Sequence, residues 1–152
     1  MPIPAGSNAP DFELADQSGT LRKLSDYLGQ PVVLYFYPKD DTPGCTTEAC
    51  NFRDDYVQYR EAGVVILGVS PDSPAKHSKF ILKYSLPFTL LADTDHQVCE
   101  LYGVWGRKKF MGREYDGVFR TTFLIDAQGQ IQKVFENVSP AGHSQEVLGA
   151  LA

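Results

Sequence analysis

The stretch VVLYFYPKDDTPGCTTEAC, residues 32–50, decides the fold because an apolar run leads directly into signals for the start of a helix. The run itself, residues 32–37, consists of valine, leucine and aromatic side chains, which is typical of a central strand covered on both faces. Pro38 ends that strand. Thr42 suits the N-cap of a helix, and the proline after it suits the first helical position, so Cys45 is expected in the first turn.

Outside this stretch, strand and helix patterns alternate along the chain. The expected elements are an N-terminal hairpin turning at Ser18-Gly19, helices at 46–62, 74–84, 95–101 and 140–151, strands at 64–69 and 88–93, and a C-terminal hairpin at 119–126 and 130–135. This order predicts a mixed sheet with helices on both faces, because right-handed crossovers leave few other windings. The predicted fold class is α/β, a thioredoxin-like sandwich with an N-terminal β-hairpin, in a single domain spanning 1–152.

Composition and cysteine content argue against several classes of protein. A chain of 152 residues can bury roughly 70% of its unfolded surface, so it needs no covalent staples. Three cysteines are too few, and odd in number, for a secreted disulfide scaffold. The N-terminal MPIPAGSNAP lacks the basic and apolar regions of a secretory signal, so a cytoplasmic location is expected.

Neither a membrane nor a nucleic acid is an expected partner. The longest apolar runs are strand-sized, whereas a membrane span needs about 20 residues. The net charge of −5 opposes binding to phosphate backbones, and the small basic cluster Arg107-Lys108-Lys109 is interpreted as part of a solvated, Gly-rich loop. In the same loop, Trp105 and Phe110 are expected to pack on the C-terminal hairpin rather than cover a site.

Cys45 and Cys50 raise three alternatives: a metal site, a structural disulfide or a reactive pair. On one intact helix their Cα atoms lie about 8.6 Å apart, whereas a disulfide usually requires less than about 7 Å. A disulfide between them would therefore require the first turns to unwind. A metal site is weakly supported, because the remaining candidate ligands have no recognised spacing. These candidates are Cys99, His77, His96 and His143.

The position of Cys45 favours reactivity. A strand-to-helix junction is where α/β sheets bind ligands, and the positive end of a helix dipole favours a thiolate. An unperturbed thiol is only about 3% ionised at pH 7, so full ionisation raises the thiolate concentration only about thirtyfold. Other groups must supply the rest of the rate acceleration. Arg120 lies within a strand pattern. Its guanidinium either faces Cys45 or, if the strand is at the edge of the sheet, extends to solvent. Cys99 is expected to be an inert core thiol, with a resolving role as the fallback.

A family resemblance joins these residues. Pro38-x-x-x-Thr42-x-x-Cys45 resembles the signature of peroxiredoxins, thiol peroxidases that reduce hydroperoxides. The five-residue offset to Cys50 is similar to the bacterioferritin comigratory protein or Q-type branch. The resemblance extends to APDFELADQSG, DHQVCELYGVWG and FMGREYDGVFRTTFLID, so it covers nearly the whole chain.

The resemblance implies a role for each motif residue. Cys45 would be oxidised by the peroxide to a sulfenic acid, and Cys50 would condense with it. Thr42 would hydrogen-bond the thiolate and the peroxide, Pro38 would shield the pocket from water, and Arg120 would orient the peroxide. Thioredoxin or a similar dithiol would reduce the disulfide, with no metal or organic cofactor, and members of this branch are often monomers.

The sequence therefore predicts an atypical two-cysteine peroxidase, with two competing functions. A thiol-disulfide oxidoreductase acting on proteins would suit the same fold, but that activity usually comes with CxxC, which TPGCTTEAC lacks. A non-enzymatic redox-sensing or holdase-like binding protein would need a surface that is exposed on unwinding. Glu48 could orient an arginine or cap the helix, and the sequence alone does not choose between these roles.

Overall fold

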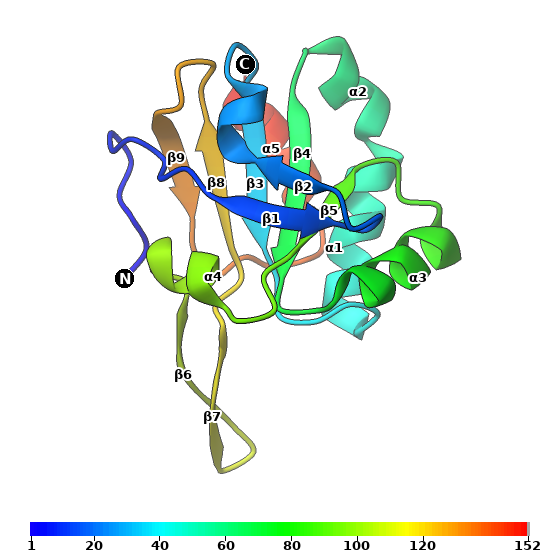
Figure 1. Cartoon of the computed structure of the whole chain (residues 1–152), viewed down its shortest axis with the longest axis vertical. Coiled ribbons are helices and arrows are strands. Elements are labelled where there is room, and N and C mark those ends of the chain that lie inside the picture. Colours follow the sequence, from blue (N-terminus) through cyan, green and yellow to red (C-terminus); the bar gives the residue numbers. More distant parts are fainter. Residues whose placement is uncertain (152) are drawn as a thin grey trace.

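The computed structural model describes residues 1–151 and shows helices packed around one large sheet (Figure 1). The strands are β1 (Glu13–Asp16), β2 (Leu21–Lys23), β3 (Val32–Phe36), β4 (Val65–Ser70), β5 (Thr89–Ala92), β6 (Trp105–Phe110), β7 (Arg113–Val118), β8 (Thr121–Ile125) and β9 (Ile131–Phe135). The helices are the 3-10 helix η1 (Leu24–Tyr27) and the α-helices α1 (Pro43–Asp54), α2 (Tyr56–Glu61), α3 (Pro74–Tyr84), α4 (Gln97–Leu101) and α5 (His143–Leu151).

The sheet is mixed, as predicted. Its seven strands run in the order β2-β1-β5-β4-β3-β8-β9, with β3 parallel to β4 and antiparallel to β8. The N-terminal hairpin of β1 and β2 joins the sheet through antiparallel pairing of β1 with β5. The C-terminal hairpin of β8 and β9 also forms as expected. These pairings confirm the α/β class.

Strand β3 lies at the centre of the core because its side chains are buried on both faces. On one face Val32, Leu34 and Phe36 pack with side chains of η1 and α4. On the other face Val33, Tyr35 and the following Tyr37 pack with side chains of α1, α2, α3 and α5. The helix that carries Cys45 is thus fixed against a strand that is buried at every residue. No helix within residues 1–151 is long and apolar enough to cross a membrane.

The predicted helix at 46–62 differs from the structure at its start and in its middle. Helix α1 begins at Pro43, because Thr42 has the extended backbone of an N-cap, with φ −96° and ψ 157°. The helical path is interrupted at Asp55, a residue type that favours helix ends over interiors, and resumes as α2. Apolar periodicity had placed the start too late because the first turn carries mainly small and polar side chains.

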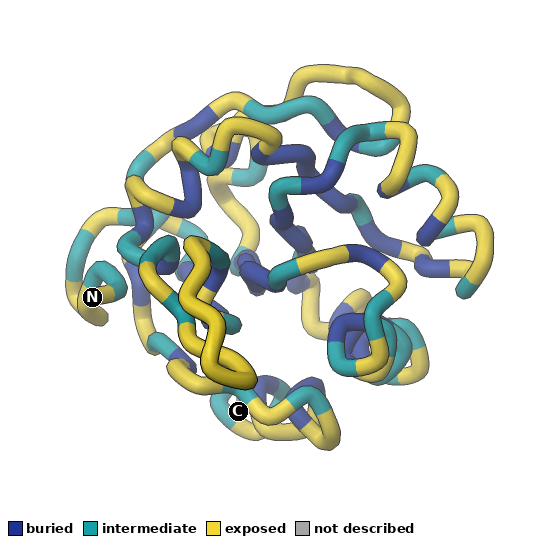
Figure 2. The backbone as a smooth tube through the Cα atoms, turned by 90° about the horizontal axis from the view of Figure 1, so that it is seen from below, coloured by how far each residue is buried: buried dark blue, intermediate teal, exposed yellow. Residues whose placement is uncertain are grey.

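The prediction of a Gly-rich loop after α4 is wrong, because the chain there forms the β6-β7 hairpin. This hairpin projects from the body of the molecule and is exposed over most of its length (Figures 1 and 2). Arg107-Lys108-Lys109 therefore lies in a strand rather than a loop. Because neither face of the hairpin is buried, its sequence lacks the alternation that marks most strands.

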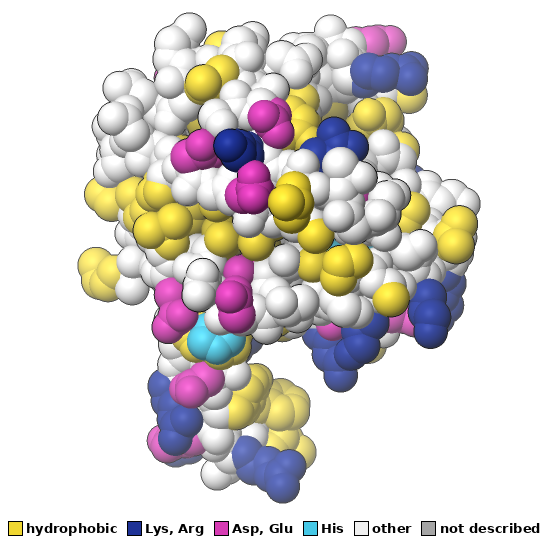
Figure 3. Space-filling view, in the orientation of Figure 1, with side chains coloured by type: hydrophobic (Ala, Val, Ile, Leu, Met, Phe, Trp, Pro, Cys, Tyr) yellow, Lys and Arg dark blue, Asp and Glu magenta, His cyan; other side chains and the backbone are white. Residues whose placement is uncertain are grey.

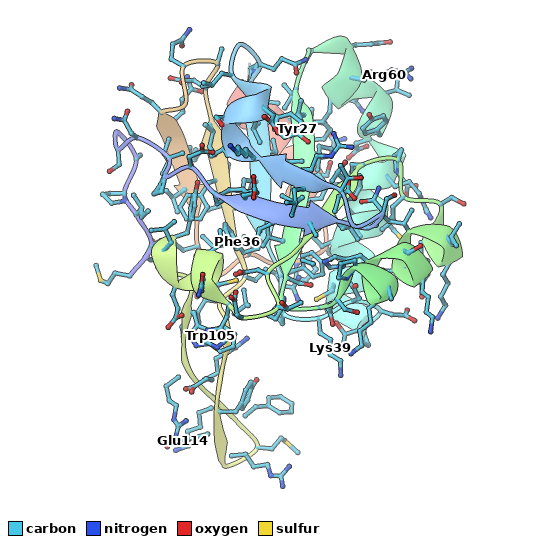
Figure 4. The ribbon with its side chains drawn as sticks, in the orientation of Figure 1. Tyr27, Phe36, Lys39, Arg60, Trp105 and Glu114 are labelled. Carbon is cyan, nitrogen blue, oxygen red and sulfur yellow. The ribbon has the colours of Figure 1, made fainter. Side chains whose placement is uncertain are left out.

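Of the two aromatic side chains expected to pack on the C-terminal hairpin, Trp105 is half-buried and Phe110 is exposed. Trp105 lies at the base of the hairpin (Figure 4). Its ring stacks on that of His96, with ring centroids 4.0 Å apart and an interplanar angle of 1°. It also contacts the core cluster that includes α4. Phe110 is 67% exposed, which contradicts the packing expected for it.

Gly68 of β4 gives a test of how tightly the core under α1 is packed. A Cβ at this position would lie 2.7 Å from Leu90 Cδ2 and 2.9 Å from Tyr35 Cζ. We expect Gly68→Ala to lower the free energy of unfolding in urea by about 1–3 kcal/mol through overpacking. The control is Gly149→Ala on α5, where nothing lies within 4 Å and alanine should be neutral or stabilising by up to about 1 kcal/mol. Equal stability of the two variants would contradict this account.

Candidate active site

Cys45 lies in the first turn of α1, as predicted. The carbonyl of Thr42 accepts the first hydrogen bond of the helix from the Thr46 amide at 2.8 Å. The Thr42 hydroxyl does not cap the helix but donates to the Lys39 carbonyl at 2.9 Å. With its proton used there, this hydroxyl can accept a hydrogen bond from a substrate but does not donate one to Cys45.

Arg120 is the charged group that contacts Cys45. Its Nη2 donates to Cys45 Sγ at 3.2 Å, and its Nη1 donates to Glu48 Oε1 at 2.6 Å. Arg120 lies between β7 and β8, just before the strand in which its sequence pattern had placed it. Gly44 permits this approach, because a Cβ there would lie 3.2 Å from Arg120 Nη2. Of the two sequence interpretations, the structure supports the arginine facing Cys45.

Glu48 holds the other side of the guanidinium. It lies three residues after Cys45, one helical turn on, and its side chain is fully buried. The structure resolves the open question about Glu48 in favour of orienting an arginine. Sequence reasoning left it off the site, although the spacing from Cys45 was the available signal.

Burial and charge act in opposite directions on this pair. Burial raises the pKa of Glu48 to about 7, even though Arg120 acts to lower it. For Arg120, burial opposes the charge, but Glu48 and Cys45 outweigh it and raise the pKa of the guanidinium. The second carboxylate oxygen, Glu48 Oε2, is buried and has no hydrogen-bond partner in the described part of the chain. Arg120 therefore remains charged beside the sulfur.

The three cysteines are free and differ in environment. Cys50 lies on the same helix as Cys45 and is half-buried. Pro38, the other predicted site residue, follows β3 and is also half-buried. Cys99 lies on α4, in the core cluster on the opposite face of the sheet from Cys45. Burial, with Asp93 beside it, raises the pKa of the Cys99 thiol well above its usual range. This environment agrees with an inert core thiol.

The candidate metal ligands do not come together. His96 stacks on Trp105, His77 contacts Asp40, and His143 contacts Thr122. Across residues 1–151 there is no group of three or more His, Cys, Asp or Glu side chains arranged to hold a metal ion.

The sequence is similar to known proteins over nearly its whole length. The sequence matches the AhpC/TSA family over residues 5–134. It is 52% identical over 150 residues to peroxiredoxin Bcp of Escherichia coli strain K12, covering 99% of this chain and 96% of the relative. Peroxiredoxin Bcp of Bacillus subtilis strain 168 is 52% identical over 151 residues, with 99% and 96% covered.

Solved structures of similar proteins share the fold. The bacterioferritin comigratory protein of Xanthomonas campestris, studied in trapped intermediate and ligand complexes for its alkyl peroxide reduction activity, has a TM-score of 0.90 and 38% identity, covering 97% of this chain and 96% of that one. A Cys→Ser mutant of Xylella fastidiosa peroxiredoxin Q has a TM-score of 0.93 and 35% identity, with 98% and 95% covered. These similarities confirm the thioredoxin-like sandwich and the resemblance found in the sequence.

The raised pKa of Glu48 predicts a pH dependence of stability. With a folded pKa of about 7 against an ordinary 4.5, this carboxyl keeps its proton in the folded chain at pH values where the unfolded chain has lost it. Its contribution to the free energy of unfolding is fully present below about pH 4.5 and is lost as the pH rises through about 7. The loss is on the order of 3 kcal/mol. Glu48→Gln stays neutral, so its stability relative to wild type in urea titrations should increase from about pH 5 to about pH 8. Parallel profiles would contradict the assignment.

Proposed function

This chain belongs to the AhpC/TSA family as a thiol-dependent peroxidase of the Bcp type, and we propose that Cys45 is the residue that its peroxide substrate oxidises. The observation that supports this assignment most directly is the hydrogen bond from Arg120 Nη2 to Cys45 Sγ in the first turn of α1. A guanidinium and a helix N-terminus both favour a negatively charged sulfur, which is the nucleophile that peroxide reduction requires.

In the proposed first step the Cys45 thiolate attacks one oxygen of a hydroperoxide. The O–O bond breaks, the sulfur becomes a sulfenic acid, and the other oxygen leaves as water or an alcohol after taking up a proton. Arg120 orients the peroxide and stabilises the charge that develops on its oxygens. The Thr42 hydroxyl accepts a hydrogen bond from the peroxide, and Pro38 limits access of water to the sulfur.

In the proposed second step Cys50 resolves the sulfenic acid. The Cys50 sulfur bonds to the Cys45 sulfur and the sulfenic oxygen leaves as water, giving an intramolecular disulfide. Because both residues lie on α1, where helical geometry sets their Cα atoms about 8.6 Å apart, the first turns must unwind before this bond can form. Local unwinding is thus part of the proposed cycle.

The cycle needs an external thiol reductant to close. We propose thioredoxin or a similar dithiol, which reduces the disulfide while its own two thiols become a disulfide. Hydrogen peroxide and organic hydroperoxides are the proposed substrates, in a monomeric, single-domain protein of the cytoplasm. No step of this cycle requires a metal or an organic cofactor.

The competing functions are less well supported. A thiol-disulfide oxidoreductase acting on proteins needs a nucleophile that a protein disulfide can reach, whereas Cys45 is 1% exposed. A redox-sensing or holdase-like protein would need only stoichiometric oxidation of Cys45, and would not need a group placed to orient peroxide.

Peroxide turnover with thioredoxin and its reductase separates these roles. Cys45→Ser should abolish turnover, because the attacking sulfur is lost. Cys50→Ser should reduce it at least tenfold while still forming the sulfenic acid, and Cys99→Ser, the matched control, should keep the wild-type rate. The rates follow from consumption of peroxide and of the reductase's electron donor. Full activity of Cys45→Ser would overturn the proposal, and loss of activity in Cys99→Ser alone would transfer the resolving role to Cys99.

A further inference from the structure

The loop before α1, residues 38–42, is fastened to α3 and β5 by a buried polar network. His77 of α3 is fully buried and reaches Asp40 Oδ2 through Nδ1 at 2.6 Å and the Leu91 carbonyl through Nε2 at 2.9 Å. The other carboxylate oxygen, Asp40 Oδ1, accepts a hydrogen bond from the Tyr37 hydroxyl at 2.5 Å. One histidine therefore connects the loop to two elements of the body.

The backbone of the loop is held at the same residue. The Asp40 amide donates to Asp72 Oδ2 at 2.8 Å, and the Ser70 hydroxyl donates to the same oxygen at 2.7 Å. Both the side chain and the main chain of Asp40 are thus fixed only a few residues before Cys45.

The proton positions make the contact with Asp40 strong. His77 Nε2 must carry a proton, because the Leu91 carbonyl can only accept. The short contact between Nδ1 and Asp40 Oδ2 then holds one further proton between the ring and the carboxyl. Because the two side chains are only 0% and 5% exposed, removing one of them leaves a buried partner that water does not compensate.

A second connection to the same loop is exposed and therefore weaker. Asp41 accepts hydrogen bonds from Lys83 Nζ and the Tyr84 hydroxyl, both at 2.8 Å. The side chains of Lys83 and Asp41 are 58% and 42% exposed, so this ion pair contributes little. Basic side chains gather beside α3 on this edge of the molecule, and Lys39 of the loop is among them (Figures 3 and 4).

We propose that His77 is a positioning residue of the peroxidase cycle. By holding Asp40 it keeps residues 38–42, and with them Cys45, in the arrangement that attacks peroxide, and so sets how often the first turn of α1 unwinds. The inference rests on the proposed function, in which attack requires the folded turn and disulfide formation requires the unwound turn.

This role has a kinetic signature that a merely structural role lacks. The rate constant for Cys45 oxidation is proportional to the folded fraction of the turn, and the rate constant for disulfide formation is proportional to its unwound fraction. We divide the rate constant for disulfide formation by the rate constant for oxidation. This quotient is inversely proportional to the ratio of folded to unwound turn, whatever the starting value of that ratio. A substitution that only destabilises the whole chain does not change this quotient.

Two substitutions of His77 separate its two contacts. Asn places an amide N–H near the position of Nδ1 and keeps a donor for Asp40, whereas Gln places it near Nε2 and keeps a donor for the Leu91 carbonyl. We expect the quotient to rise about tenfold or more in His77→Gln and to stay within about threefold of wild type in His77→Asn. Both rate constants follow from rapid mixing of reduced protein with hydrogen peroxide, acid quenching, and quantification of sulfenic acid and disulfide by mass spectrometry.

The matched control is Lys83→Gln, which removes the exposed tie to the same loop and should change the quotient by about twofold or less. Equal quotients in the Gln and Asn variants of His77 would overturn the inference, while the inactivity of Cys45→Ser would still uphold the proposed function. If His77→Gln does not fold, Asp40→Asn replaces it, since a neutral amide gives a weaker partner for His77. A wild-type quotient in that variant would likewise overturn the inference.

Discussion

Helix α1 imposes one constraint on which the chemistry of this protein depends. Its first turn places Cys45 beside Arg120, where the sulfur can be held as a nucleophile, and the same turn keeps Cys45 too far from Cys50 to form a disulfide. The proposed cycle therefore requires this turn in two conformations. The folded turn serves attack on peroxide, and the unwound turn serves resolution.

The surrounding structure stabilises the folded turn from three sides. Below it, the helix packs on the aromatic core of β3, where Phe52 stacks on Tyr35 with centroids 4.8 Å apart. Beside it, Glu48 holds the guanidinium that contacts the sulfur. Before it, the buried contact between His77 and Asp40 fixes the loop. None of these contacts is a hydrogen bond between paired strands, so the turn can open without breaking the strand pairing of the sheet.

Local signals made much of the fold and part of the site predictable from the sequence. Helix α3 occupies the predicted residues 74–84, and in the structure Ser73 caps its start. The start of α1 was visible in Thr42 and the proline after it. The pairing of Arg120 with Glu48 joins residues 72 positions apart, so no local pattern could select it. The β6-β7 hairpin was missed because exposure of both its faces leaves no apolar alternation.

The coupling of oxidation to unwinding is tested most directly by amide hydrogen exchange across residues 45–52. The reduced protein and the disulfide form are compared, both carrying Cys99→Ser. Oxidation should remove protection from the first turns of α1, while the amides of β3 should stay protected in both forms. Equal protection of residues 45–52 in the two forms would show that the disulfide forms without unwinding, and would contradict the central claim.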